Sequence, residues 1–340
     1  MMKALVWYEK KAVRIEERPI PSIANDEVLM KVSFAGICGS DIHIIDGEFP
    51  ENIAKPPLIL GHEFSGIITE VGKDVTEYKE GDRATAHPFV GCGGCYFCKR
   101  AQEHFCTNPY CVLWDPRSGA FAEYVVLKAR QVYKIPDTMS LEEAALVEPI
   151  SIAVHALDLV DLKIGHTVAI QGAGAIGLAC LQIALRSGAS LAILSDPVES
   201  RLKIGQKLGA DVVVNPIKEN LYEIVKEKTN GLGVDLSIDA ATVKNSLDAC
   251  IPITKNTGTV LIVGVAPHKM RMEVSPFEIY SRELRIQGSN WSPYSFIRTI
   301  PIMDKINVEP MITHVFPLTD YIEAIGVARG KEGIKVLLTP

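Results

Sequence analysis

The chain has 340 residues, of which 47% are hydrophobic and 22% are charged, and its formal net charge is −6. A chain of this length usually divides into two domains, and these fractions are ordinary for a globular enzyme. The acidic balance and the scattered basic residues argue against a protein that binds nucleic acid or an acidic membrane surface.

The N-terminal segment does not have the pattern of a secretory signal peptide, because charges at Lys3, Glu9 and Lys10 interrupt it early. The most apolar segment, 167–194, contains four glycines and several polar side chains. A membrane-spanning helix needs about 20 uninterrupted apolar residues. We therefore expect a cytoplasmic protein with reduced cysteines, no membrane partner and no nucleic-acid partner.

Residues 1 to about 150 are predicted to form an antiparallel, barrel-like β-domain. Short β-type runs at 27–32, 64–72 and 121–126 are separated by segments containing glycine and proline. Regular spacing of such runs is typical of barrels and sandwiches.

Metal-binding side chains occur in two glycine-containing runs of this first part. Cys38 lies in one run, and His62 and Glu63 lie in the other. A thiolate, an imidazole and a carboxylate would leave an open position on zinc, as a catalytic site requires. Glu148 adds a carboxylate just before the pattern of the chain changes. Each residue alone has an ordinary reading, such as a buried cysteine or a hydrogen-bonded histidine.

Four cysteines follow within fifteen residues, and four thiolates make a closed tetrahedral site of the kind that holds structural zinc. A ferredoxin-type iron–sulfur motif continues with three residues and Cys-Pro, whereas here seven residues intervene and Thr107 follows. A disulfide framework is disfavoured because the chain is long and its other cysteines are dispersed. The spacing is Cys92-x2-Cys95-x2-Cys98-x7-Cys106.

From about residue 150, predicted strands alternate with predicted helices. This alternation indicates βαβ units and a doubly wound parallel sheet, so the fold class is α/β. The expected domains are 151–287 for this sheet, and 1–150 together with 288–340 for the first domain. The expected strands are 168–170, 191–194, 212–214, 236–238, 260–263 and 284–287, with helices at 199–208 and 219–229.

Gly172, Gly174 and Gly177 form a Gly-x-Gly-x-x-Gly turn between a predicted strand and a predicted helix. Such a turn lets the backbone approach a pyrophosphate at the helix N-terminus. Asp196 lies 19 residues past Gly177, near the spacing of about 20 expected for the acid that binds a ribose. Its charge would repel a 2′-phosphate, which favours NAD over NADP. The alternative is that the glycines only permit close packing and that Asp196 caps a helix.

Taken together, these motifs resemble the zinc-dependent medium-chain dehydrogenases, the superfamily of alcohol, polyol and threonine dehydrogenases. The resemblance runs nearly end to end. It implies a GroES-like β-barrel catalytic domain with a structural zinc lobe at 91–107, a Rossmann NAD-binding domain, and a homodimer or homotetramer. Besides the cysteines and glycines it rests on the runs 38–43, 61–66, 81–83, 119–124, 148–149 and 335–338.

The resemblance also implies a role for each residue of the metal site. Cys38 and His62 would bind the catalytic zinc, with Glu63 or Glu148 as the third ligand or as an exchangeable partner. Asp41 would orient His62. With the structural site, this gives two zinc ions per subunit.

For the reaction, the resemblance implies that Ser40 and His43 relay the alcohol proton to solvent. It also implies a set of cofactor-binding residues. This set is Gly172, Gly174, Ala175, Ile176, Gly177, Asp196, Arg201, Val263 and Val265.

Glu148 stands where dehydrogenases of simple alcohols have a second cysteine ligand, which favours the polyol and sugar-derivative branch. We expect oxidation of a secondary alcohol of a polyol, sugar acid or sugar-alcohol derivative to a ketone, with hydride transfer to NAD. L-Threonine 3-dehydrogenase and 2,3-butanediol dehydrogenase are alternatives within this class. The complete reactive set disfavours a non-catalytic dinucleotide sensor, and the four cysteines disfavour a zinc-free quinone reductase. Candidate substrate residues are Arg117, Ser289, Asn290 and Trp291, with Trp114, Asp115 and Tyr294 nearby, although the aromatic residues could equally serve packing.

Overall fold

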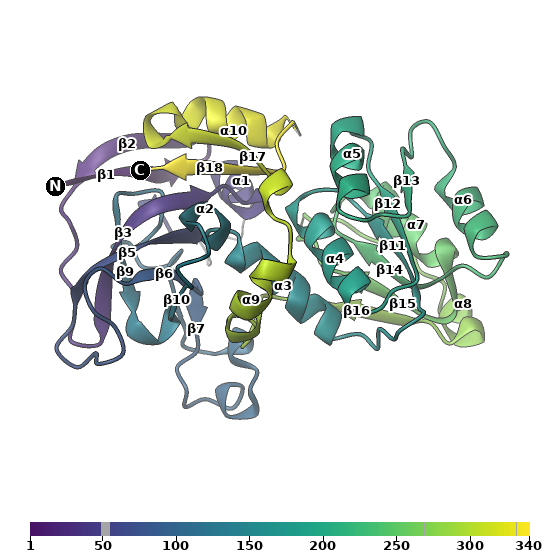
Figure 1. Cartoon of the computed structure of the whole chain (residues 1–340), viewed down its shortest axis with the longest axis horizontal. Coiled ribbons are helices and arrows are strands. Elements are labelled where there is room, and N and C mark those ends of the chain that lie inside the picture. The colour runs from purple at the N-terminus through teal and green to yellow at the C-terminus, as the bar shows by residue number, and fades with distance from the viewer. Residues whose placement is uncertain (49–54, 268, 331) are drawn as a thin grey trace. The chain divides into compact units, whose positions relative to one another are not determined.

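The computed structural model describes residues 1–48, 55–267, 269–330 and 332–340. The chain forms two compact units (Figure 1). The first unit comprises Met1–Glu148, Phe296–Asp304 and Ile312–Pro340, and the second comprises Pro149–Ser295 and Lys305–Met311.

The first unit is built on β3 (Glu27–Gly36), which pairs antiparallel with β5 (Glu63–Val71) along most of its length. Near its start β3 also pairs with β9 (Tyr124–Lys128), and near its end with β18 (Lys335–Thr339). The other strands of this seven-stranded sheet are β6 (Arg83–Ala86), β10 (Val132–Lys134) and β17 (Ile312–Pro317). A three-stranded sheet contains β1 (Met2–Glu9), β2 (Ala12–Arg18) and β4 (Leu58–Ile59), and β7 (Phe89–Val90) pairs with β8 (Tyr110–Cys111).

The two larger sheets of this unit enclose an apolar core that includes the fully buried Leu60, Phe64 and Phe121. The alternation of apolar residues along β3 and β5 places one face of each strand in this core. Apart from the parallel pair β17 and β18, the pairings within these sheets are antiparallel. The expected GroES-like, barrel-like fold is confirmed.

Short helices connect the strands of the first unit. Ser140 begins one of them, because its hydroxyl accepts a hydrogen bond from the Glu143 amide at 3.1 Å, as helix-capping serines do. The helices are α1 (Gly39–Ile45), α2 (Leu141–Ala144), α9 (Phe296–Ile302), α10 (Tyr321–Arg329) and the start of α3 (Val147–Asp158). Short 3-10 helices of this unit occupy Cys98–Arg100, Glu103–Phe105, Ala129–Gln131 and Leu318–Asp320. Met303–Lys305 spans the boundary to the second unit, and Glu309–Met311 belongs to the second unit.

The second unit contains a six-stranded parallel sheet in the order β13-β12-β11-β14-β15-β16. This order confirms the expected doubly wound α/β fold. The strands are β11 (Thr167–Gln171), β12 (Leu191–Ser195), β13 (Val212–Val214), β14 (Val234–Asp239), β15 (Thr254–Ile262) and β16 (Arg285–Gly288). The helices are α4 (Ala175–Arg186), α5 (Glu199–Lys207), α6 (Leu221–Lys228), α7 (Lys244–Ile253) and α8 (Pro276–Arg282).

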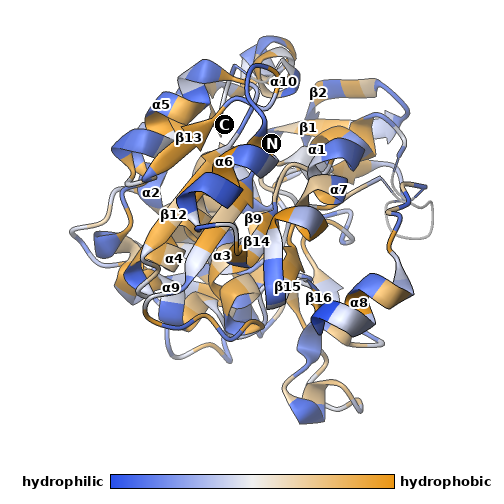
Figure 2. Ribbon diagram, turned by 90° about the vertical axis from the view of Figure 1, so that its right-hand side faces the viewer, coloured by the Kyte–Doolittle hydropathy of each residue, from blue (hydrophilic) through white to orange (hydrophobic). Residues whose placement is uncertain are grey.

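Helices cover both faces of this sheet, with α4 and α5 on one side and α6 on the other (Figure 1). The strands β12 and β13 are coloured mainly as hydrophobic, whereas α5 and α6 carry hydrophilic segments (Figure 2). This difference follows from burial, because a parallel strand covered on both faces has no solvent-facing side. Among the described residues, no helix is long and apolar enough to cross a membrane.

Two predicted strands differ from the observed ones. The run 121–126 was expected to be continuous, but β9 begins only at Tyr124, because the Phe121 amide bonds to the Leu60 carbonyl and Ala122 forms an isolated bridge with Ala4. The strand expected at 260–263 begins at Thr254 instead. Its early part is polar, so an apolar pattern could not reveal it.

Candidate active site and cofactor site

Cys38 is placed by the junction between β3 and α1. It is the N-cap residue of α1, and its backbone N–H donates to Asp41 Oδ2 at 2.9 Å. The Gly61 N–H lies 3.3 Å from Asp41 Oδ1, so this fully buried carboxylate joins the two runs that carry the metal-binding side chains. Carboxylates in the first turn of a helix are favoured by the helix dipole.

Glu63 begins β5 beside this junction and His62 directly precedes it, and both are almost completely buried. One ligand atom each from Cys38, His62 and Glu63 lies within 4.8 Å of the other two. This convergence of sulfur, nitrogen and oxygen matches the mixed ligand set of catalytic zinc. The residues therefore fit the metal that the sequence implies.

The two ring nitrogens of His62 face different partners. Nδ1 lies 3.4 Å from Asp41 Oδ1, and Nε2 lies 3.3 Å from Ser40 Oγ. Burial acts to lower the His62 pKa, but the Asp41 carboxylate and Cys38 outweigh it and raise the pKa well above its ordinary value. A negatively charged environment that attracts a proton to this imidazole would equally attract a metal cation.

Lys335 is a residue of this cluster that the sequence did not reveal as functional. Its side chain is 3% exposed, and its ammonium pairs with the Glu63 carboxylate and lies 3.3 Å from the Ile37 carbonyl. A Cβ at Gly36 would collide with Glu63, so the glycine leaves room for the pair. The sequence offered one signal, a lysine at the start of an apolar strand. A lysine is rarely buried unless it is paired.

Glu148 lies in the first turn of α3 and is 4% exposed. Burial raises its pKa to about 7, and the nearby His62 opposes this shift. Its carboxylate is not one of the three ligand groups that converge within 4.8 Å. Glu148 is therefore close enough to interact electrostatically with His62 and Glu63 without belonging to their tight cluster.

Ser40 and His43 lie on one face of α1, three residues apart. Ser40 Oγ lies 3.3 Å from Nε2 of His62, whereas His43 Nδ1 lies 2.6 Å from the exposed carboxylate of Glu48. The His43 side chain is 27% exposed. The pair thus extends from the buried cluster toward solvent.

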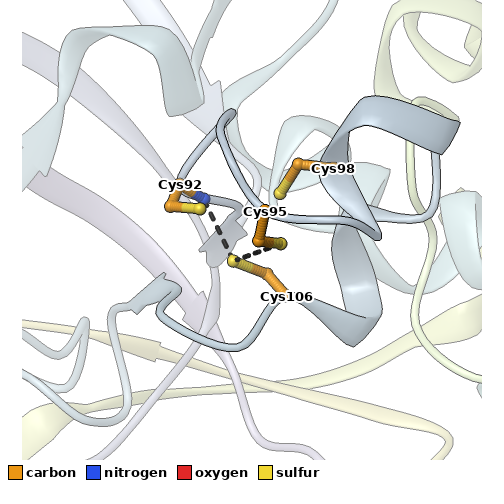
Figure 3. A group of neighbouring side chains, drawn as sticks. All are labelled: Cys92, Cys95, Cys98 and Cys106. Atoms are coloured by element: carbon orange, nitrogen blue, oxygen red, sulfur yellow. Dashed lines mark hydrogen bonds between the residues drawn. The ribbon is translucent and has the colours of Figure 1, made fainter.

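The four cysteines lie in an exposed loop that contains only short 3-10 helices (Figure 3). All four sulfurs lie within 4.8 Å of one another and none is in a disulfide. The distance from Cys95 Sγ to Cys106 Sγ is 3.8 Å. Zinc–sulfur bonds of about 2.3 Å in a tetrahedron also require sulfurs about 3.8 Å apart.

Backbone amides lower the pKa of the Cys92 and Cys95 thiols, whereas burial raises the pKa of Cys98 to about 12. The Cys92 N–H donates to Cys106 Sγ at 3.1 Å, and amide bonds from Cys98 and Thr107 lower the Cys95 pKa to about 6. A thiolate is the form that binds zinc. Gly91 is required here, because a Cβ would lie 2.6 Å from Cys98 Sγ.

The glycine turn connects β11 to α4. A Cβ at Gly177 would lie 1.7 Å from the Gly172 carbonyl oxygen, so this glycine permits close helix–strand packing. Gly174, in contrast, has open space at its Cβ position, and Ala175 and Ile176 are also partly exposed. Gly177 therefore serves close packing, and the backbone at Gly174 is accessible.

Asp196 follows β12 and closes the turn. Its Oδ2 accepts from the Ala173 amide and its Oδ1 from the Val198 amide, both at 2.8 Å. Burial lowers the pKa of Arg201, on α5, and the charge of Asp196 partly opposes this shift. At the end of β15, Val263 is buried and Val265 is 60% exposed.

The candidate substrate residues are divided between the two units. Arg117 pairs with Asp115 at 2.8 Å and with Glu27 at 3.2 Å. Glu27 begins β3, whereas Cys38 follows its end, and ten extended residues span roughly 30 Å. We therefore leave Arg117, and with it Asp115, out of the proposed site. Ser289, Asn290 and Trp291 follow β16 in the second unit, and Trp114 stacks edge-on against Phe89.

Comparison with known proteins agrees with this geometry. Residues 24–137 match the family described as alcohol dehydrogenase GroES-like domain, and residues 175–305 match the zinc-binding dehydrogenases. The chain is 37% identical to D-arabitol-phosphate dehydrogenase of Enterococcus avium, over 94% of this chain and 91% of that protein. Other relatives are sorbitol dehydrogenases, D-xylulose reductases and an L-threonine 3-dehydrogenase.

Solved structures show the same likeness over the whole chain. A putative zinc-binding dehydrogenase of Sinorhizobium meliloti 1021 bound to NADP matches with a TM-score of 0.95 and 34% identity, over 100% of this chain and 99% of that one. An alcohol dehydrogenase of Escherichia coli CFT073 complexed with NADH matches with a TM-score of 0.91 and 31% identity, again over 100% and 99%. The chain belongs to the zinc-dependent medium-chain dehydrogenases, within the branch that includes the polyol dehydrogenases.

Proposed function

We propose that the chain oxidises a secondary alcohol of a polyol or sugar derivative to a ketone, with transfer of the hydride to NAD. The observation that carries the proposal is the convergence of Cys38, His62 and Glu63 within 4.8 Å of one another. The reaction class, a zinc-dependent oxidoreductase of secondary alcohols, is that of its relatives. The substrate is the part that the proposal adds.

In this proposal Cys38, His62 and Glu63 hold the catalytic zinc, which when bound would polarise the substrate hydroxyl and favour loss of its proton. Asp41 Oδ1 lies 3.4 Å from Nδ1 and would orient the imidazole, which leaves Nε2 to hold the metal. Lys335 pairs with Glu63 and holds its carboxylate in place. Glu148 supplies a second buried carboxylate beside this position.

Ser40 and His43 receive the proton of the substrate hydroxyl in this scheme. Ser40 Oγ is within reach of the buried cluster, and the part-exposed imidazole of His43 passes the proton to solvent. Both residues lie on α1. Replacement of Ser40 by alanine would therefore interrupt the relay without removing a metal ligand.

We infer that the cofactor is NAD. Gly174 leaves backbone open for the pyrophosphate, with Ala175, Ile176 and Val265 accessible nearby. Asp196 is held by two amide bonds at the end of β12, where its charge would disfavour a 2′-phosphate. Replacement by serine should shift the preference toward NADP, measured as the ratio of kcat/KM for the two cofactors.

The substrate is tested with a panel of polyols, sugar acids, polyol phosphates, L-threonine and 2,3-butanediol, with NADH formation as the readout. Turnover of a polyol or sugar acid that a chelator abolishes is the expected result. Preference for L-threonine or 2,3-butanediol would instead assign one of the two alternative substrates. Absence of turnover with every alcohol in zinc-loaded protein would contradict the proposed reaction.

We further propose that the enzyme is a cytoplasmic homodimer or homotetramer. The exposed thiols of the four-cysteine loop suit a reducing compartment, where they stay available to zinc. Sedimentation of the zinc-loaded protein gives the oligomeric state directly, and a monomer would contradict this part of the proposal.

A further inference from the structure

A pocket of about 260 Å³ lies in the second unit, at the amino ends of the parallel strands, where β14 and β16 begin. The glycine turn follows the carboxyl end of β11, whereas the pocket lies at the amino ends of the parallel strands. The two features therefore lie at opposite ends of the strands of this sheet. None of the residues assigned above to the metal, the cofactor or the substrate lines this pocket. The pocket therefore has no role in the proposed reaction.

An irregularity in β15 builds one wall of the pocket. Val234 of β14 pairs with Thr254, but Leu236 pairs with Thr259, so residues 255–258 bulge out of the ladder. Within the bulge Thr257 adopts φ of +65°, which is unfavourable for a β-branched side chain. Bulges and strained residues of this kind gather at binding sites.

Basic side chains from separate segments line the pocket. Lys163 precedes β11, Lys255 belongs to the bulge, and Arg285 begins β16. The pocket also contains two carboxylates, Asp161 and Asp235. Three cationic side chains against two carboxylates leave a local excess of positive charge in a chain whose formal net charge is −6.

The two carboxylates already have partners. Asp235 Oδ2 accepts from the amide and the hydroxyl of Thr167, each at 2.9 Å, and Asp235 Oδ1 pairs with Lys255. Asp161 pairs with Lys163 at 2.9 Å. Within the part of the chain that the structure describes, the Arg285 side chain forms neither a hydrogen bond nor a salt bridge, although the bond from Lys163 and the charge of Arg285 together lower the Asp161 pKa. Its guanidinium is therefore available to a ligand.

His166 offers a further donor to the pocket. Its Nδ1 accepts a hydrogen bond from the Lys163 backbone N–H at 3.2 Å, so the neutral ring carries its proton on Nε2. Nε2 lies 3.7 Å from Asp235 Oδ1, which is too long for a good hydrogen bond. The Nε2–H group is therefore available to donate to a ligand.

We propose that this pocket binds a phosphate dianion, either free phosphate or a phosphate monoester. The guanidinium of Arg285 would bind two phosphate oxygens, as arginine does at planar bidentate contacts, with Lys163 and His166 adding charge and a donor. The pocket is larger than one phosphate group, so it has room for a small organic substituent. This proposal does not depend on the identity of the alcohol substrate.

The test is calorimetric titration of the zinc-loaded, full-length protein with inorganic phosphate at constant ionic strength, with NAD present to occupy the glycine turn. We expect a saturable site that Arg285→Gln weakens at least about tenfold, because a charge-assisted bidentate contact is lost. Lys228→Gln removes the same charge from an exposed position on α6 and should change the affinity less than about twofold. Arg285 is exposed, and the thermal midpoint of each variant reports whether it has folded.

A parallel titration with glycerol 3-phosphate distinguishes the two sources of the dianion. Tighter binding of the monoester would identify an organic ligand, and equal or weaker binding would identify free phosphate. The proposal is overturned if wild-type protein shows no saturable heat with phosphate up to tens of millimolar. It is equally overturned if folded Arg285→Gln binds phosphate as tightly as Lys228→Gln.

Discussion

The two metal sites of the first unit are built in opposite ways. The catalytic cluster is mostly buried, and its ligands are held by amide hydrogen bonds that Asp41 accepts and by an ion pair with Lys335. The four-cysteine loop is largely exposed, and its sulfurs are held by backbone amides and glycine geometry. The folded core therefore positions the ligands of the catalytic site, whereas we expect the zinc ion itself to order the four-cysteine loop.

This difference predicts different consequences of losing the metal. The core around Phe64 and Phe121 does not depend on the catalytic zinc, so its loss should remove activity and leave the fold. None of the four cysteines of the loop is fully buried, and small segments without a core take folding free energy from their metal. Loss of that zinc should therefore disorder the loop.

The largest expected effect comes from His62→Ala. Turnover should fall by at least about three orders of magnitude, because Lewis-acid catalysis contributes several kcal/mol to lowering the barrier. Circular dichroism should remain that of the wild type. His166→Ala removes a histidine outside the cluster and should keep full turnover, and equal losses in the two variants would refute the assignment.

Lys335→Met tests whether the buried ion pair supports the cluster. In metal-free protein this change should lower the free energy of unfolding by about 3–5 kcal/mol, because the Glu63 carboxylate is left buried without a cation. Zinc-loaded protein should lose less, since the metal provides the missing positive charge. The measurement is denaturant unfolding with and without zinc, and an identical loss in both states would argue against Glu63 as a ligand.

Cys95→Ser probes the other site. Zinc affinity at the loop should fall by at least about 100-fold, since even supporting contacts of a metal site contribute 10- to 100-fold. Limited proteolysis should then cut the loop while the core resists. A variant in which the loop stays protected without its zinc would remove the contrast between the two sites.

The smallest expected effect is on the free energy of unfolding, from a change at Glu27, a buried carboxylate outside both metal sites. Burial acts to raise the Glu27 pKa, but bonds from the Ala24 amide, Arg117 and Lys128 lower it below its ordinary value of 4.5. Because the folded-state pKa is depressed, Glu27 adds stability above pH 4.5 that is lost as the pH falls through the folded pKa.

Glu27→Gln should therefore destabilise the protein by about 1–2 kcal/mol at neutral pH. The difference from the wild type should shrink below pH 4.5, as measured by unfolding at several pH values. A difference that is constant with pH would contradict this account.

The sequence predicted the features whose residues are neighbours in the chain. The cysteine spacing and the glycine turn are local patterns, and the fold brings their members together as expected. The strands of the parallel sheet were also predictable, because buried parallel strands are continuous apolar runs. Cys38, His62 and Glu63 were predicted because their runs are distinctive and lie close in sequence.

Pairings between distant residues were not predictable. Lys335 is 272 residues from Glu63, and no local pattern connects them. Arg117 was expected to bind substrate, but it pairs with Glu27, 90 residues away. The bulge in β15 could not be predicted either, because its polar residues do not follow the apolar pattern from which a strand is recognised.

The most direct test of the catalytic cluster compares zinc content with turnover in wild type, Cys38→Ala and Cys180→Ala. Cys180 is buried in α4 and serves as the matched control. The two groups of metal-binding residues predict two zinc ions per wild-type chain. Cys38→Ala should retain the zinc of the four-cysteine loop and lose turnover, while Cys180→Ala keeps both ions and its activity. Full turnover in Cys38→Ala, or loss of both zinc ions from folded Cys38→Ala, would contradict a catalytic zinc held by Cys38, His62 and Glu63.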